Sequence, residues 1–353
     1  MKKSTVPLIW ITAILLAAAL PFAGLYPVLL MKILCFGLYA CAFNLLLGYT
    51  GLLSFGHAAF YGVAAYTTGY LLKTTALPLP ASWAAGVLAA GLLGLLFGWL
   101  AIRRSGIYFA MITLALSQMV YFVVLQVPAS GGEDGLQGLP RGTLLGLDLS
   151  NDLTLYFVVL AVFMAAFGLI WRIVHSPFGQ LLTAIRENEP RALSLGYDVG
   201  NYKLLAFTLS AALAGLAGSL KTSVLGFATL TDVLWSTSGA AIFMVLVGGI
   251  GTLTGPLVGA LVIILLETGI GDAGNWLAAQ TGVKWFATLG ESVSLVTGLI
   301  FMLFVLALRR GIVGTAADAL GTWRQRRRAE ASAASAASAL PEQRKKVTGD
   351  GGR

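Results

Sequence analysis

The sequence predicts an all-α fold: a polytopic transmembrane helix bundle of about ten spans, with broken or re-entrant segments where glycines cluster. Of the 353 residues, 58% are hydrophobic and 11% are Asp, Glu, Lys or Arg, whereas an average soluble domain is about 25% charged. So few polar side chains could not coat a soluble globule of this size without large exposed apolar patches. The composition therefore argues against a water-soluble enzyme and favours lipid as the surrounding medium.

Ten apolar stretches are long enough, or nearly so, to cross a hydrocarbon core of ~30 Å as helices. They are residues 7–25, 28–47, 57–72, 82–102, 107–127, 153–174, 203–222, 231–249, 254–271 and 288–308. The stretch at 57–72 is short and flanked by glycines, which is typical of a discontinuous or re-entrant segment. We expect a break at Gly248–Pro256, because a single long span there would move the basic tail to the other side of the membrane.

Lysine and arginine accumulate in short cytoplasmic loops, so their positions predict the orientation of the chain. With Lys2 and Lys3 inside, ten crossings also place Arg103, Arg104 and the loop from Arg172 to Lys203 in the cytoplasm. Few basic residues then face outwards. Both termini are therefore expected on the cytoplasmic side.

The expected organisation is a transmembrane domain over residues 1–310 and a basic, disordered cytoplasmic tail over residues 311–353. Within the domain, residues 175–203 form a cytoplasmic loop and residues 128–152 an external loop. The net charge of +8 is concentrated in the tail, which is typical of an anchor that fixes orientation and argues against nucleic-acid binding. Residues 1–20 also fit a signal peptide, and an uncleaved first helix is the favoured interpretation.

Small residues recur at helix-contact spacing. Lipid supplies no hydrophobic drive between helices, so close backbone approach through small residues is how such helices associate. We expect these stripes to pack helices together, without a necessary role in transport. They are Ala211, Gly215 and Ser219; Ser210, Ala214, Gly218 and Thr222; Gly94 and Gly98; and Gly255 and Gly259.

The loop HSPFGQLLTAIRENEPRALSLGYDVGNYK (175–203) contains a short amphipathic helix that is too polar to cross the membrane. Such a helix lies on the membrane surface or docks on a partner, and the partner is favoured here because a solvated loop needs no apolar stripe. The apolar residues at helical spacing are Leu181, Leu182 and Ile185; Arg186, Glu187, Glu189 and Arg191 lie on or near the other face; and Gly196 closes the segment after Pro190.

The segment GYTGLLSFGHAAFYGVAAY (48–66) places four glycines and several polar residues at membrane depth. Its backbone is expected to be unwound or kinked beside protein or a polar cavity, so Thr50, Gly51, Ser54 and His57 are candidates for a translocation path. For His57, a histidine hydrogen-bonded inside the bundle is an equally good interpretation.

A third segment, VGGIGTLTGPLVGA (247–260), repeats this glycine pattern and adds Gly248, Gly251 and Thr254 to the path candidates. The repetition fits either an internal duplication or the general abundance of glycine. Glu267 follows in the next stretch, where an interfacial position is as good an interpretation as a functional one.

Catalytic, cofactor-binding and metal-binding motifs are missing from the sequence. His57 and His175 are the only histidines, and Cys35 and Cys41 lie on different helix faces. We therefore expect no enzyme activity, no cofactor and no metal. The sequence also has no phosphate-binding GxxxxGK[ST] loop, so any ATP must be bound by another chain.

Together, these segments and SGGEDGLQGLP (130–140) resemble the permease subunits of ATP-binding-cassette importers for branched-chain amino acids, in particular the LivM type. The likeness spans roughly residues 28–308, and its most specific part is AIRENE with the downstream LGYDVGNYK. It implies a bacterial inner-membrane subunit that works with a second permease, two cytoplasmic ATPase subunits and a periplasmic binding protein. By analogy, Leu181 to Gly196 would dock on an ATPase subunit.

Alternatives remain open for the solute and the energy source. The same family also resembles importers of urea, short amides and aromatic acids. An ion-driven carrier or channel is a further alternative, although proton-coupled carriers place acidic residues at mid-membrane, where only Glu267 is a marginal candidate.

Overall fold

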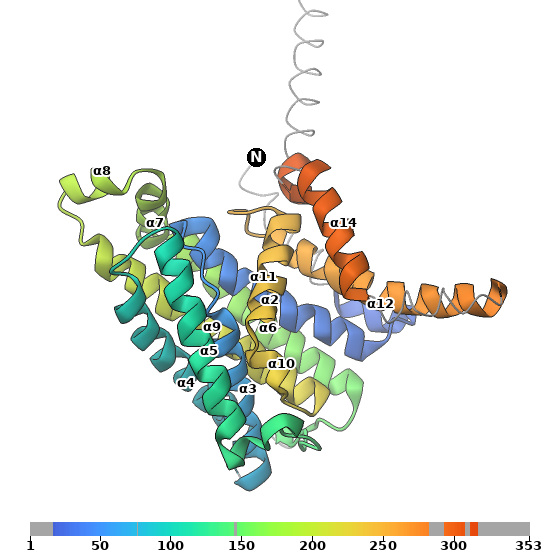
Figure 1. Ribbon diagram of the computed structural model, residues 1–353. Helices are drawn as coiled ribbons and strands as arrows, with labels where there is room; N and C mark the ends of the chain where they lie inside the picture. Colours follow the sequence, from blue (N-terminus) through green and yellow to red (C-terminus); the bar gives the residue numbers. More distant parts are fainter. Residues whose placement is uncertain (1–16, 76, 145–146, 282–292, 308–310, 317–353) are drawn as a thin grey trace, which may run out of the picture.

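The computed structural model describes residues 17–75, 77–144, 147–281, 293–307 and 311–316. These residues form a bundle of helices, which confirms the expected all-α class (Figure 1). The strands found in the described part belong to one antiparallel hairpin, β1 (Thr143–Leu144) and β2 (Leu147–Asp148), within the external loop.

The helices follow the apolar stretches of the sequence closely. The longer ones are α2 (Pro27–Thr50), α3 (His57–Thr74), α4 (Leu79–Ala101), α5 (Ile107–Gln126), α6 (Asp152–Val174), α9 (Val199–Leu225) and α12 (Gly255–Thr281). The shorter ones are η1 (Leu20–Ala23), η2 (Pro128–Ser130), η3 (Gly132–Asp134), α7 (Pro177–Glu187), α8 (Glu189–Ser194), α10 (Leu230–Val233), α11 (Trp235–Gly248) and α14 (Val293–Ala307).

Within the described residues, five helices are long and apolar enough to cross a membrane: α2, α4, α5, α6 and α9. The stretch 57–72 was expected to be discontinuous or re-entrant; α3, which covers it, is one unbroken helix of 18 residues. The irregular backbone lies just before it, in residues 51–56. Gly51 ends α2 with φ of 75°, whereas Gly62 inside α3 serves packing, because a Cβ there would collide with Val233 of α10.

The centre of the bundle is α9, which packs against α2, α3 and α4. The small-residue stripes make these contacts, as expected from their spacing. A Cβ at Gly218 would collide with the carbonyl of Tyr61 on α3, and a Cβ at Gly94 on α4 would collide with Ala211. Backbones therefore approach through glycine and alanine, as in other membrane bundles.

The expected break near Gly248 is confirmed, because α11 ends at Gly248 and α12 begins at Gly255. The two helices pack together as a hairpin. A Cβ at Gly248 would collide with the carbonyl of Gly255, and one at Gly259 would collide with the carbonyl of Met244. Glycine is thus required at the close approach of the two helices.

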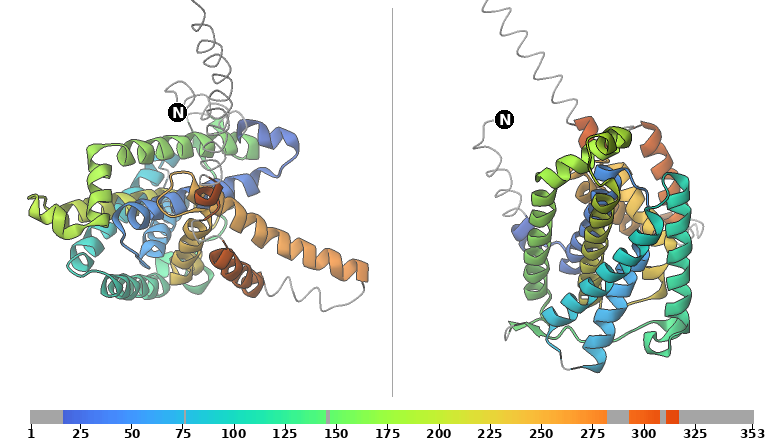
Figure 2. Two further views of the ribbon diagram at one scale, coloured as in Figure 1. Left: turned by 90° about the horizontal axis from the view of Figure 1, so that it is seen from above. Right: turned by 90° about the vertical axis from the view of Figure 1, so that its left-hand side faces the viewer.

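Two connecting regions lie at opposite ends of the bundle (Figures 1 and 2). One end carries α7 and α8, which with the following residues to 198 we call the arm. The other end carries α10 and the external loop with η2 and η3. We call these the arm end and the loop end.

Parts of the expected organisation fall outside the described residues: residues 1–16, which include the start of the first stretch, residues 288–292 and 308 of the tenth stretch, and residues 317–353 of the tail. The tail was expected to be disordered from residue 311. Residues 311–316 are helical instead. Gly311 packs against Gly249, because a Cβ there would lie 2.5 Å from the Gly249 backbone.

Candidate functional site at the junction of the glycine-rich segments

The two glycine-rich segments meet at the arm end of the bundle. Asn44 of α2 joins them, since its Nδ2 donates to the carbonyl of Thr252 at 2.9 Å and its Oδ1 accepts from the amide of Gly251 at 3.0 Å. A Cβ at Gly48 would lie 2.8 Å from that amide nitrogen, and Gly251 has φ of 73°. Glycine at these two positions permits the contact and the turn.

Asn44 was not singled out from the sequence, although it is a polar amide inside the apolar stretch 28–47. A buried amide at membrane depth needs hydrogen-bonding partners. Its partners are backbone groups of a turn that lies far away along the chain, so only the fold reveals them.

Arg186 of α7 lies across the same junction. Its guanidinium Nη1 donates to the carbonyl of Gly48. A Cβ at Gly51 would lie 3.0 Å from its Cγ, and one at Gly251 would lie 3.1 Å from its Nη1. The arginine therefore touches both glycine-rich segments at once.

The contact has a clear electrostatic cause. Gly48 is in the last turn of α2, where carbonyls lack partners within the helix and the helix dipole is negative. An arginine at this end satisfies one of those carbonyls with a charge-assisted hydrogen bond. The next carbonyl back, that of Leu47, accepts from the amide of Gly51 at 3.2 Å.

α7 is held in place by its own sequence. Ser176 caps its first turn by accepting from the amide of Gly179 at 3.3 Å, and Pro177 occupies the first helical position. Leu182 and Ile185 are buried, and α7 packs on α2. The predicted apolar stripe is thus covered by this chain itself.

The remaining arm residues lie in different surroundings. Leu181 is half-buried against the small cluster that contains Ile185. Glu189 pairs with Lys203, with 2.6 Å between Oε1 and Nζ. Those exposed on the surface are Glu187, Arg191 and Gly196.

Three apolar side chains of the arm are exposed. Leu193, Leu195 and Tyr197 are 55%, 68% and 45% exposed. No separate role was predicted for any of the three from the sequence. Exposed apolar residues that gather on a projecting segment are typical of a protein interaction surface. We call these three residues the arm patch.

His57 lies away from this junction, inside the bundle, and is fully buried. Its ring is surrounded by Phe43, Phe60 and Phe207, with ring centroids 4.8, 5.5 and 5.9 Å away. Its Nε2 is 2.8 Å from Ser210 Oγ, whose own proton is donated to the carbonyl of Ala42 at 2.5 Å. Nε2 therefore carries the ring proton, and the surroundings match the packed-histidine interpretation.

The irregular backbone before α3 is held by hydroxyl groups. The amide of Phe55 donates to Thr113 Oγ1 at 3.2 Å, while Ser238 Oγ accepts from the amide of Ala58 at 2.8 Å and donates to the carbonyl of Phe55 at 2.9 Å. Ser54 is buried and accepts from the amide of Gly56 at 3.1 Å. Hydroxyl groups of neighbouring helices thus supply the hydrogen bonds that this non-helical backbone lacks, which lipid could not supply.

Thr50 and Thr254 complete the predicted path residues. Thr50 is buried and its hydroxyl donates to the carbonyl of Leu46 at 2.5 Å, within α2. Thr254 directly precedes α12 and accepts from the amide of Val258 at 3.2 Å through its carbonyl. The structure therefore gathers Gly48, Gly51 and Gly251 around Arg186, and leaves Ser54 and His57 within the bundle.

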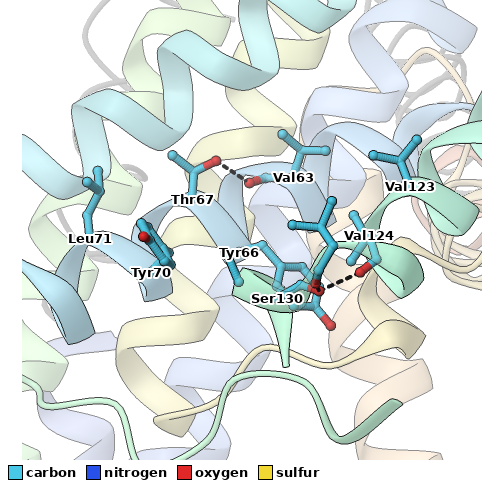
Figure 3. A pocket seen from close by; sticks show the side chains of 10 residues that line it. Val63, Tyr66, Thr67, Tyr70, Leu71, Val123, Val124 and Ser130 are labelled. Carbon is cyan, nitrogen blue, oxygen red and sulfur yellow. Dashed lines mark hydrogen bonds between the residues drawn. The ribbon is translucent and has the colours of Figure 1, made fainter. Parts of the chain in front are cut away.

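A cavity of about 300 Å³ lies between α3, α5 and η2, at the loop end (Figure 3). Its walls are largely apolar, and none of the predicted path residues lines it. The lining residues are Val63, Tyr66, Thr67, Tyr70, Leu71, Val123, Val124, Val127, Ala129 and Ser130. Across the described residues, no group of His, Cys, Asp and Glu could hold a metal ion.

Comparisons with known proteins agree with these features. The family model "Branched-chain amino acid transport system / permease component" matches residues 26–308. The permease LivM of Escherichia coli is 30% identical over 252 residues, which cover 63% of this chain and 58% of LivM. The match therefore spans less than two thirds of that relative's length.

Two other permeases are also similar to this chain. LivH of Salmonella typhimurium, also named for branched-chain amino acid transport, is 24% identical to this chain. The matched region covers 66% of this chain and 80% of LivH. The ribose import permease RbsC of Bacillus subtilis is 30% identical to this chain, and the matched region covers 48% of this chain and 52% of RbsC. Because the family model covers most of its length and its helices are those of a multi-pass membrane protein, this chain belongs to the branched-chain amino acid transport permease family.

Proposed function

We propose that the protein is a permease subunit of an ATP-binding-cassette importer in a bacterial inner membrane, with both termini in the cytoplasm. Together with a second permease it forms the path for a branched-chain or related amino acid. The observation that carries this proposal is Arg186, which connects the arm to both glycine-rich segments. Family membership and the names of LivM and LivH support the solute class.

The energy for transport comes from two ATPase subunits bound at the arm, and a periplasmic binding protein delivers the solute at the loop end. Support for separate ATPases comes from the lack of a nucleotide-binding motif in this sequence. Support for docking at the arm comes from the arm patch, which this chain leaves uncovered. Leu182 and Ile185 of the α7 stripe are buried, Ile185 packs with Ala192 and Val199, and α7 as a whole contacts α2.

Movement of the ATPases acts on the bundle through α7. Because Arg186 contacts the last turn of α2 and the turn between α11 and α12, displacement of the arm moves both helix ends together. The permease pair alternates between outward and inward openings as nucleotide binding changes their relative populations.

The solute passes along the glycine-rich segments, between the bundle interior near His57 and the junction at Arg186. We assign its border to the glycine-rich segments, with Thr50, Gly51, Ser54, His57, Gly248, Gly251 and Thr254 as its residues. His57 shapes this border through its contacts with aromatic rings and Ser210 and exchanges no proton with the solute. Gly48 and Gly251 lie at the contact between the two segments, so their backbones can approach each other and shut the path at the junction.

A crosslinking experiment tests the docking of the arm. A photoreactive phenylalanine analogue at Leu195 should crosslink to an ATPase subunit in the assembled complex, and the yield should change on ATP addition. The matched control is Leu92 on α4, which is 67% exposed, similar to the 68% of Leu195. It should give no ATPase adduct. An equal yield at both positions would contradict docking at the arm patch.

Uptake measurements separate the importer from the ion-driven carrier. Cells that express the full transporter should accumulate radiolabelled leucine or valine, and deletion of the ATPase subunits should abolish this uptake. Persistent uptake that collapses with the ion gradient would instead identify a carrier.

A further inference from the structure

A buried ion pair lies at the loop end, away from the junction. Lys221 in the last turns of α9 pairs with Asp232 of α10, with 2.7 Å between Nζ and Oδ2. The two side chains are only 5% and 9% exposed. Lys221 Nζ also lies 3.4 Å from the carbonyl of Phe227 and 4.5 Å from the centroid of its ring.

The aspartate also organises the connection between the two helices. Its Oδ2 accepts from the amide of Thr229 at 2.9 Å and from Thr229 Oγ1 at 3.4 Å. Gly226, with φ of 73°, ends α9 just before this connection. Lys221 and Asp232 therefore fix the shape of residues 226–229 from both sides.

Residues 226–229 in turn hold the external loop. Leu136 and Ala228 exchange two backbone hydrogen bonds of 2.9 and 2.8 Å, and the amide of Leu139 donates to the carbonyl of Gly226 at 3.0 Å. The side chains of Leu136 and Leu139 are buried beneath the loop, next to Gly69 of α3. The loop is thus fastened to a connection whose shape depends on the ion pair.

We propose that Lys221 and Asp232 are positioning residues that hold the external loop against the loop end, so that the loop and the α9–α10 connection move as one body. A buried ion pair is a poor source of net stability, because apolar residues of similar size stabilise a core as well. What apolar residues cannot do is bind the Thr229 amide and the Phe227 carbonyl. The role of the pair is therefore positional, and it stands independently of the solute and of the ATPase.

Hydrogen–deuterium exchange on the full chain in nanodiscs, purified with any partner subunits, tests this role. In Lys221→Met, amides of residues 134–142 and 224–230 should exchange about tenfold faster or more, because an unpaired buried carboxylate opens the connection. Lys221→Arg, which keeps the charge, should retain most of the protection. Lys203→Met is the matched control, since Lys203 is also a buried, paired lysine but lies at the arm end.

A double variant separates the effect of the ion pair on the placement of the external loop from its effect on the stability of the whole chain. Lys221→Met with Asp232→Leu should recover the thermal stability of the native chain, yet residues 134–142 should still exchange rapidly. Native protection of the loop in the double variant, or in Lys221→Met alone, would overturn the proposal. If Lys221→Met yields no folded protein, the double variant and the milder Asp232→Asn decide the question by the same exchange measurement.

Discussion

Arg186 joins three segments of the chain at one point. Lysine would not replace it well, because a guanidinium presents several donors on a rigid plane, whereas an ammonium is a compact point charge. The arginine side chain also runs past Gly51 and Gly251. A larger residue at either glycine would push it away from the Gly48 carbonyl. The junction thus depends on an arginine and on glycines that leave it space.

Arg186→Ala should reduce solute uptake by the assembled transporter by about tenfold or more, since a hydrogen bond to a charged group contributes roughly 1.5–3 kcal/mol. Uptake rate per assembled complex is the measurement. Arg104→Ala, an exposed arginine in the connection between α4 and α5 and outside the arm, should leave uptake near the native level. Native uptake by the Arg186 variant would show that the arm acts through another contact.

At the scale of elements, α9 illustrates what the sequence predicts well. The spacing of its small residues predicts close packing on two faces, and the structure places Gly218 against α3 and Ala211 against α4. Helical periodicity is a local property, so the sequence carries it directly. The periodicity does not show which helix packs against each face, because that depends on residues far away along the chain.

The contacts that sequence analysis missed all join distant parts of the chain. Asn44 donates a hydrogen bond to the carbonyl of Thr252, in the turn between α11 and α12. Ser238 donates a hydrogen bond to the carbonyl of Phe55. A single polar residue in an apolar stretch signals that a partner exists, but the fold alone identifies it. In the arm, Leu182 and Ile185 of the apolar stripe are covered by this chain itself, and Ile185 packs with Ala192 and Val199.

Gly218→Val should destabilise the bundle, because its Cβ would collide with the backbone carbonyl of Tyr61, which cannot rotate away. We expect a loss of about 1–3 kcal/mol or more, the usual effect of overpacking. The measurement is thermal unfolding of the purified chain in detergent. Gly168→Val on α6 is the control, since nothing lies within 4 Å of a Cβ there. Equal unfolding temperatures for the two variants would refute close packing between α3 and α9.

At the scale of the whole molecule, the arm and the external loop lie at opposite ends (Figure 1). The distribution of basic residues predicts the same separation, because it places the loop 172–203 inside and residues 128–152 outside. Hydropathy and charge therefore anticipated the layout of the bundle. They could not anticipate the ion pair that fastens the external loop, because that pair depends on the turn between α9 and α10.

Cysteine labelling tests the separation of the two ends. Gln137→Cys in the external loop should react with a membrane-impermeant maleimide in right-side-out vesicles, and Leu195→Cys only in inverted vesicles. The native Cys35 and Cys41 are buried and should contribute little background. Labelling of both positions in the same vesicle preparation would rule out the proposed topology.

The arm patch has a consequence for the synthesis of this chain in the cell. Leu193, Leu195 and Tyr197 protrude from a segment that we place in the aqueous interior, where chaperones and proteases recognise uncovered apolar surface. We therefore expect quality control to remove copies made in excess of the subunits that we propose cover this patch. On this basis, the steady-state abundance of the chain should rise and fall with the supply of those subunits.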